Sequence, residues 1–205
     1  MYVPKLFEIT DWTEISRFIR TNPLGTLVSR GDQAPVATHV PFQLETNKGD
    51  KSVLTGHVAR GNPQCGLFES QPDVLVIFLS PIQHYVSSSW YGHPNVPTWN
   101  YMSVHIYGRL QIVEGERLRK SLEETTLHHD QISSHPLTDE VLRGEIDKQI
   151  GGIVGFEIEI ERVEAAYKMS QNRSDKDYAS IITELEKLND YSAKMVAEKM
   201  KGKGK

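Results

Sequence analysis

Residues Ile153–Tyr167, with the sequence IVGFEIEIERVEAAY, decide the class of the fold. Apolar and charged side chains alternate along this stretch, which is typical of a strand that packs one face on a core and exposes the other to water. Pro35–Leu44 shows the same alternation. Asp73–Leu79 (DVLVIFL) is a nearly continuous apolar run, which predicts a strand buried on both faces. The protein is therefore predicted to be mainly β.

Turn residues and helical periodicity divide the rest of the chain. Further extended segments are predicted at Leu24–Ser29, Ser52–Ala59, Gln83–Ser87 and Tyr101–Glu114. Several strands separated by turns, together with two helical excursions, predict an antiparallel barrel decorated with helices, and periodicity alone does not distinguish this barrel from a sandwich. We expect one domain over residues 1–174 with a helical insertion near 116–150, a helical appendage over 175–200 and a disordered tail over 201–205.

The composition excludes several classes of protein. The chain has 205 residues and a formal net charge of -4, so any binding to nucleic acid must come from a local basic patch. No apolar run is long enough to cross a bilayer, and the N-terminus lacks the apolar core of a signal peptide. Cys65 is the single cysteine, which excludes an intrachain disulfide and fits a reducing compartment. We therefore expect a cytoplasmic protein with no membrane partner.

The sequence contains none of the common catalytic or metal-binding motifs. There is no HExxH, no GxSxG, no GxGxxG and no P-loop. His39, His57 and His105 fall in three different predicted strands and could converge, but their spacing matches no metal site. We therefore predict no metal, and from spacing alone we interpret these histidines as hydrogen-bonded side chains.

The segment Thr55–Gln64 (TGHVARGNPQ) combines the end of a strand with the start of a helix. Arg60 precedes Asn62 and Pro63, which have the form of a helix N-cap followed by proline at the first helical position. A guanidinium beside free helix amides is a suitable seat for a phosphate group. The alternative is a surface arginine next to an ordinary capped helix, and this segment taken alone favours that alternative.

Aromatic side chains concentrate in Tyr85–Tyr107, which holds two of the three tryptophans. Aromatic groups interleaved with polar ones such as Asn100 can sandwich a planar ring and read its edge. The same residue types are common at dimer contacts, and the two interpretations are compatible because a cofactor can lie between subunits. Lys168–Ser174 (KMSQNRS) follows the last strand and is either a ligand-binding turn or a solvated one.

Together these segments resemble the PaiB family of FMN-binding negative transcriptional regulators. The resemblance covers about the first 190 residues, with its motifs in the family's order. Its motifs are THVPF (Thr38–Phe42), TGHVARGNPQ (Thr55–Gln64), SSSWY (Ser87–Tyr91), VPTWNYMSVHIYG (Val96–Gly108) and KMSQN (Lys168–Asn172). The resemblance implies an FMN-binding split β-barrel of the pyridoxamine-phosphate-oxidase type, and a homodimer with FMN between its subunits.

The resemblance also implies which residues contact the flavin. In such barrels the phosphate is held by basic and hydroxyl groups on the second and third strands, and the ring is bordered by later strands. The implied cofactor-binding residues are Thr38, His39, Thr55, His57, Arg60, Asn62, Trp99, Asn100, His105, Lys168, Ser170, Gln171 and Asn172. The wider superfamily carries a second basic residue directly after the arginine of this loop, where this chain has Gly61. We therefore expect weaker phosphate binding unless Lys168 substitutes.

Three functions agree with this reading. The first is an FMN-binding negative regulator of transcription, whose contact with DNA would depend on the basic stretch Lys194–Lys205 because no helix-turn-helix pattern is present. The second is a flavin-dependent oxidoreductase or reductase for a small molecule, with His39, His57 or Tyr101 as a proton donor. The third is a flavin-storage or sensing module. No catalytic residue is assigned, and the substrate residues of true pyridoxamine-phosphate oxidases are not recognisable.

Overall fold

The structure is a computed structural model that describes residues 1–46, 51–130, 133–134 and 137–203. The chain divides into two compact units, each built from separate stretches. The first unit contains Met1–Phe18, Phe78–His105 and Glu164–Lys205, and the second contains Ile19–Ile77 and Ile106–Val163. The elements that run from one unit into the other are α1 (Trp12–Thr21), β5 (Asp73–Leu79), β7 (Thr98–Val113) and β8 (Ile153–Lys168).

The second unit holds most of the strands. Its own elements are β1 (Leu24–Ser29), β2 (Val36–Pro41), β3 (Gln43–Thr46), β4 (Ser52–Ala59), the 3₁₀ turns η2 (Pro63–Leu67) and η5 (Ile150–Gly152), and the helices α2 (Gly115–His129) and α3 (Asp139–Gln149). The hydrogen-bonded strand order is β2-β1-β5-β7-β8-β4-β3, with β6 (His84–Val86) paired to β7. Strand β1 pairs antiparallel with β2, and β4 pairs antiparallel with β3 and β8.

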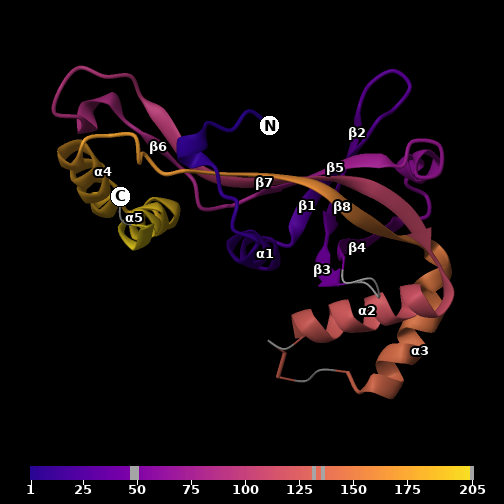
Figure 1. Cartoon of the computed structure of the whole chain (residues 1–205). Coiled ribbons are helices and arrows are strands. Elements are labelled where there is room, and N and C mark those ends of the chain that lie inside the picture. The colour runs from indigo at the N-terminus through magenta and orange to yellow at the C-terminus, as the bar shows by residue number, and fades with distance from the viewer. Residues whose placement is uncertain (47–50, 131–132, 135–136, 204–205) are drawn as a thin grey trace. The chain divides into compact units, whose positions relative to one another are not determined.

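Aromatic rings form the centre of the second unit's core. Phe156 of β8 is fully buried and packs against Phe68 after η2, with ring centroids 5.4 Å apart, and against Phe42, at 6.1 Å. Helix α2 pairs with α3 (Figure 1). It also packs on β8, because a side-chain carbon at Gly155 would lie 2.3 Å from Leu118 Cδ1. The predicted helical insertion therefore covers part of the sheet.

The first unit is built around the C-terminal helices. Besides β6, its elements are η1 (Lys5–Phe7), η3 (Ser88–Trp90), α4 (Asp175–Lys187) and α5 (Tyr191–Lys203). Ser174 caps α4, and α4 and α5 lie side by side (Figure 1). The apolar faces of these helices are buried, including Ile181 and Leu185 of α4 and Val196 and Met200 of α5. Over the described residues, no helix combines the length and apolar character needed to span a bilayer.

Most predicted elements are confirmed, and the differences have local causes. The stretch Pro35–Leu44 is two strands rather than one, because the backbone N–H of Phe42 donates to Pro23 at 2.8 Å and the chain then changes partner from β1 to β4. The stretch Lys201–Lys203 belongs to α5 instead of a disordered tail, and 204–205 lie outside the described residues. The predicted domain boundaries at 174 and 200 stay predictions.

Strand β5 differs from its prediction in a way that bears on assembly. Val74, Val76 and Phe78 are buried, as expected. The alternate residues are not: Leu75 and Ile77 are half-exposed, and Leu79 is 49% exposed. In the single chain, β5 is therefore buried on one face only. The prediction of a strand buried on both faces is wrong for the single chain.

Candidate functional site

Thr38 and Asn62 meet in a hydrogen-bonded network of the second unit. The Oδ1 of Asn62 caps η2 by accepting from the backbone N–H of Gln64 at 2.9 Å. Its Nδ2 donates to Thr38 Oγ1 at 2.9 Å, and Thr38 Oγ1 donates to Gln64 Oε1 at 2.6 Å. The fully buried Gln64 in turn donates from Nε2 to Ser29 Oγ at 2.9 Å. This network joins η2 to β1 and β2, and it brings two predicted site residues together.

Gln64 belongs to this network but was not among the predicted site residues. It stands inside the segment TGHVARGNPQ, two residues after the capping asparagine. An amide at that position of a short helix gives no sign of burial by itself. Its burial follows from the packing of η2 against β1 and β2, which periodicity does not reveal.

Neighbouring residues of β2 point to opposite faces, as the period of a strand requires. Thr38 faces η2, whereas His39 is exposed and its Nδ1 lies 3.0 Å from Thr26 Oγ1 on β1. A ligand on one face of β2 therefore contacts the side chain of Thr38 or that of His39, and not both. The structure does not bring this predicted pair together.

Thr55 lies in a second network, under helix α2. It is 2% exposed, and its hydroxyl donates to Glu45 Oε1 at 2.7 Å. Arg117 of α2 donates to Glu45 Oε2 at 2.8 Å and to Glu157 Oε1 of β8. The hydroxyl of Thr55 is thus engaged by the protein, and the ion pairs of Arg117 hold α2 against β3 and β8. Neither Glu45 nor Arg117 was singled out from the sequence.

Arg60 bonds to the backbone beyond the helical insertion. Its Nε donates to the carbonyl of Gly151 and its Nη2 to that of Ile153, both at 2.8 Å. The turn η2 that follows is only five residues long, and the Asn62 side chain already caps it. A phosphate at this place would therefore rely on the remaining guanidinium N–H groups rather than on a helix N-terminus. His57, on the same strand end, is partly buried, and this burial lowers the pKa of its imidazole.

In the first unit, Asn100 and Ser170 form a buried pair. Asn100 is 0% exposed and Ser170 is 1% exposed. The Ser170 hydroxyl donates to Asn100 Oδ1 at 2.9 Å, and Asn100 Nδ2 donates to Met200 Sδ of α5 at 3.5 Å. Ser170 has a φ of 59°, in the left-handed region that residues other than glycine seldom adopt. These two predicted site residues thus face the C-terminal helix.

Other predicted residues of the first unit lie on its surface. Trp99 is 53% exposed and packs edge-on against Tyr85, with ring centroids 6.0 Å apart. Next to it, Thr98 Oγ1 accepts a hydrogen bond from Lys168 Nζ. Burial, and to a lesser extent the charge of Arg173, lower the pKa of Lys168. An exposed indole and a partly desolvated ammonium can border a planar, anionic ring system.

The remaining members of the KMSQN turn have different surroundings. The Gln171 side chain folds back on the turn, accepting from Met169 N–H at 2.7 Å and donating to the Tyr167 carbonyl at 2.7 Å. Asn172 is exposed. The turn therefore offers Asn172 and Lys168 to solvent, whereas Gln171 maintains its shape.

His105 of β7 carries a polar atom that lacks a partner. Its Nδ1 is buried and has no hydrogen bond with any residue that the structure describes. Burial lowers the pKa of this imidazole, and the amino terminus of Met1 lowers it further. A buried polar atom of this kind is normally satisfied by water or a ligand. His105 is thus compatible with a place beside a bound group.

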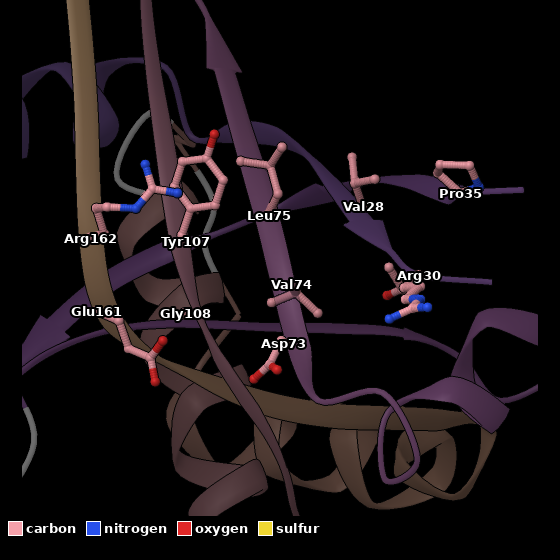
Figure 2. A pocket seen from close by; sticks show the side chains of 11 residues that line it. Val28, Arg30, Pro35, Asp73, Val74, Leu75, Tyr107, Gly108, Glu161 and Arg162 are labelled. Atoms are coloured by element: carbon pink, nitrogen blue, oxygen red, sulfur yellow. The ribbon is translucent and has the colours of Figure 1, made fainter. Parts of the chain in front are cut away.

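A groove of about 470 Å³ crosses the strands of the second unit (Figure 2). In the figure, Tyr107, Leu75, Val28 and Pro35 follow one another across the sheet. The guanidinium carbon of Arg162 lies 3.6 Å from the centre of the Tyr107 ring. Charged side chains border this apolar row, namely Arg30, Asp73, Glu161 and Arg162. The groove has the composition of a protein contact, with aromatic and arginine side chains and a polar rim.

Two solved structures with a similar fold are described as a FAD and heme binding protein and a flavocytochrome. The FAD and Heme binding protein from Mycobacterium smegmatis matches with a TM-score of 0.59 and 16% identity, covering 84% of this chain and 79% of that one. The Flavocytochrome Anf3 from Azotobacter vinelandii matches with a TM-score of 0.60 and 16% identity, covering 87% of this chain and 78% of that one. These likenesses show the fold and confirm the predicted split β-barrel with helices.

Sequence similarity then identifies the family. Residues 1–162 match the profile described as "Putative FMN-binding domain". "Protease synthase and sporulation protein PAI 2" from Bacillus subtilis is 41% identical over 204 residues, which cover 99% of this chain and 98% of that one. The chain belongs to this family of FMN-binding proteins, as the resemblance to PaiB proteins implied, and FMN is its cofactor.

The residues of this chain fit that cofactor. The second unit supplies the amide of Asn62 and the guanidinium of Arg60, which are suitable donors for a phosphate, whereas the Thr38 hydroxyl already donates to Gln64. Taken by itself, the first unit presents the exposed indole of Trp99 and the buried Nδ1 of His105, which has no hydrogen-bond partner among the described residues. FMN, when bound, supplies reversible electron transfer through its ring, while the protein supplies binding and electrostatics.

Proposed function

We propose that this protein is a homodimeric FMN-binding negative regulator of transcription, of the PaiB type, that works in the cytoplasm. The observation that carries the proposal is the 41% identity with PAI 2 over 99% of the chain, which includes the C-terminal helices as well as the FMN-binding domain. The relative is named for protease synthesis and sporulation. We therefore assign to this protein a role in controlling the expression of genes for such processes.

The exposed face of β5 supports the homodimer. Its sequence is apolar at every position of VLVIFL, yet one chain buries only alternate residues. Leu75 lies opposite Val28 of β1 and Ile77 opposite Thr26, so the half-exposed face continues across strands. The groove of Figure 2 adds Tyr107 and a rim of mixed charge. A second copy of the chain would bury this face and match positive with negative side chains of the rim.

We further propose that FMN lies at this dimer's subunit interface. Arg60 and Asn62 of one subunit would hold its phosphate, with Thr38 bonded to Asn62. The later strand that carries Trp99, with Lys168, would come from the other subunit and border the ring. Among the described residues, the two backbone bonds of Arg60 use Nε and Nη2 and leave Nη1 available, which supports the phosphate role. The other predicted contacts stay predictions: His39, Thr55, His57, Asn100, His105, Ser170, Gln171 and Asn172.

Arg60→Ala tests the phosphate site when FMN is compared with riboflavin, which lacks the phosphate. We expect the affinity for FMN to fall about tenfold to a hundredfold, because a hydrogen bond to a charged group is lost. The affinity for riboflavin should stay the same. Fluorescence titration measures both. Arg143→Ala, an exposed arginine of α3 paired with Glu123, is the control and should change neither. An equal loss for both flavins would mean that Arg60 only supports the backbone.

Binding to DNA is the test of the regulatory role. Helix α5 buries Val196 and Met200 and leaves Lys194 and Lys199 exposed, so these lysines add local positive charge to an acidic protein, although Glu198 is exposed as well. We expect a mobility shift with the promoter DNA of the regulated gene that persists at physiological salt and is lost in Lys194→Glu/Lys199→Glu. Lys120→Glu/Lys148→Glu on α2 and α3 is the matched control. A shift that any DNA produces and that modest salt abolishes would contradict the proposal.

A flavin-dependent oxidoreductase is the second candidate function. The lowered pKa and unsatisfied Nδ1 of His105 favour it, because a neutral imidazole near a flavin can accept a proton. Bleaching of the flavin by NADH or NADPH, followed by reoxidation with a small-molecule acceptor, would support this candidate over the regulator. Stable flavin binding with neither turnover nor a DNA shift would leave the storage or sensing module.

A further inference from the structure

The segment between β5 and β7 presents aromatic side chains on a short backbone support. Its strand β6 is three residues long, and β7 is its pairing partner among the described strands. Tyr85 is 41% exposed and packs against Trp99. Trp90 stacks on His84 with ring centroids 6.3 Å apart and an angle of 14° between the planes. A strand this short fixes its neighbours poorly, so other contacts must hold the segment in place.

Those contacts come from side chains of the C-terminal helices. Ser192 of α5 accepts from the backbone N–H of Gln83 at 3.0 Å and donates to its carbonyl at 2.7 Å. Ser180 of α4 donates to the carbonyl of Trp90 at 2.7 Å. These bonds join positions about half the chain apart and satisfy backbone groups on both sides of β6 and η3.

Asp177 secures the end of the same segment. It is 3% exposed, and its Oδ1 accepts from the backbone N–H of Gly92 at 2.8 Å. Its Oδ2 accepts from the Ser174 hydroxyl at 2.7 Å, within the N-cap of α4. The Gly92 N–H, followed by the Ser174 hydroxyl, lowers the pKa of this carboxyl group, so it stays ionised at neutral pH. A buried, charged acceptor is among the stronger hydrogen-bonding partners that a loop can have.

We infer that α4 and α5 are the positioning element of the aromatic segment 81–92, and that Asp177, Ser180 and Ser192 tune flavin affinity without touching the flavin. All three residues lie beyond residue 162, where the match to the FMN-binding profile ends. The effect on affinity rests on the proposed flavin site, whereas the positioning rests on the hydrogen bonds alone. Because the segment is held through its backbone, its aromatic side chains keep a fixed place on the surface before any ligand arrives.

The test uses the full chain with Ser180→Ala and Ser192→Ala, alone and combined. Hydrogen exchange of the protein without added flavin, followed by mass spectrometry, should show faster exchange in peptides covering 81–92 and unchanged exchange in β4. FMN titration should show about fivefold to thirtyfold weaker binding in the double variant, as expected for two lost hydrogen bonds. Ser180→Thr, which keeps the hydroxyl, should show the exchange rate and the affinity for FMN of the wild type.

Thr183→Ala is the matched control. Thr183 lies on the same helix, but its hydroxyl donates to Ala179 of that helix. It should change neither exchange nor affinity. Unchanged exchange in 81–92 in the double variant would overturn the positioning, and faster exchange with unchanged FMN affinity would overturn the link to the flavin. If the wild type itself fails to bind FMN, the proposed flavin site fails, and the exchange data still decide whether α4 and α5 position the segment.

Discussion

Leu75→Glu should convert the protein to a monomer that no longer retains FMN. Leu75 lies half-exposed on β5, in the apolar row of the groove between Tyr107 and Val28 (Figure 2). A carboxylate in this apolar row would lose water when the proposed interface forms, and the burial of a charge among apolar side chains is strongly unfavourable. We expect the dimer dissociation constant to rise about a hundredfold or more, in line with about 3 kcal/mol for one such charge.

Light scattering coupled to size exclusion measures the mass, and the flavin absorbance of the same peak measures retention. Val141→Glu is the matched control, because Val141 is 49% exposed on α3 and lies outside the groove. It should remain a dimer with bound flavin. A Leu75→Glu dimer that keeps its flavin would refute the interface, and a wild type that is monomeric at every concentration would refute the dimer itself.

The sequence predicted the fold well wherever a strand or helix shows its own period. Apolar and charged residues alternate over positions 156–161 of the stretch Ile153–Tyr167, and β8 spans Ile153–Lys168. Asp73–Leu79 was predicted with its correct bounds but with the wrong burial. The physical reason is that an apolar residue can be buried either by its own chain or by a partner chain, and the sequence does not distinguish the two. An apolar run on a half-exposed strand is therefore better evidence about the assembly than about the single chain.

The site was predictable only in part, because motifs identify residues but not their hydrogen-bond partners. Thr38 and Asn62, which the resemblance named separately as site residues, are hydrogen-bonded to each other, and Gln64, which completes their network, was not predicted. The role of Arg117 could not be predicted, because its partners Glu45 and Glu157 lie on two other elements that are far from it in sequence. Asn100, by contrast, was named from the sequence, but its surroundings were not. It was predicted to lie near the flavin, and the structure buries its side chain against Ser170 and Met200.

Gly108→Ala should destabilise the protein more than any other single methyl group that we consider. Gly108 ends the VPTWNYMSVHIYG stretch at the point where β7 lies against β8. A β-carbon there would lie 2.2 Å from the carbonyl oxygen of Glu159 and 2.8 Å from Ile158 Cγ2. The first neighbour is backbone, so it cannot move aside without disturbing β8. We expect a loss of about 2–3 kcal/mol in the free energy of unfolding, as for an overpacked core. The melting temperature should fall by about 4–12 °C.

Gly144→Ala is the control that separates this clash from the general effect of replacing glycine. Gly144 lies inside α3 and has no atom within 4 Å of the position that a β-carbon would take. Alanine is the better helix former by about 1 kcal/mol, so this variant should melt about 2–4 °C higher than the wild type. Thermal unfolding followed by circular dichroism would show the two opposite shifts. If Gly108→Ala were as stable as the wild type, β7 and β8 could not approach each other as closely as they do here. The close approach of these strands would then give no reason for a glycine at the end of the aromatic stretch.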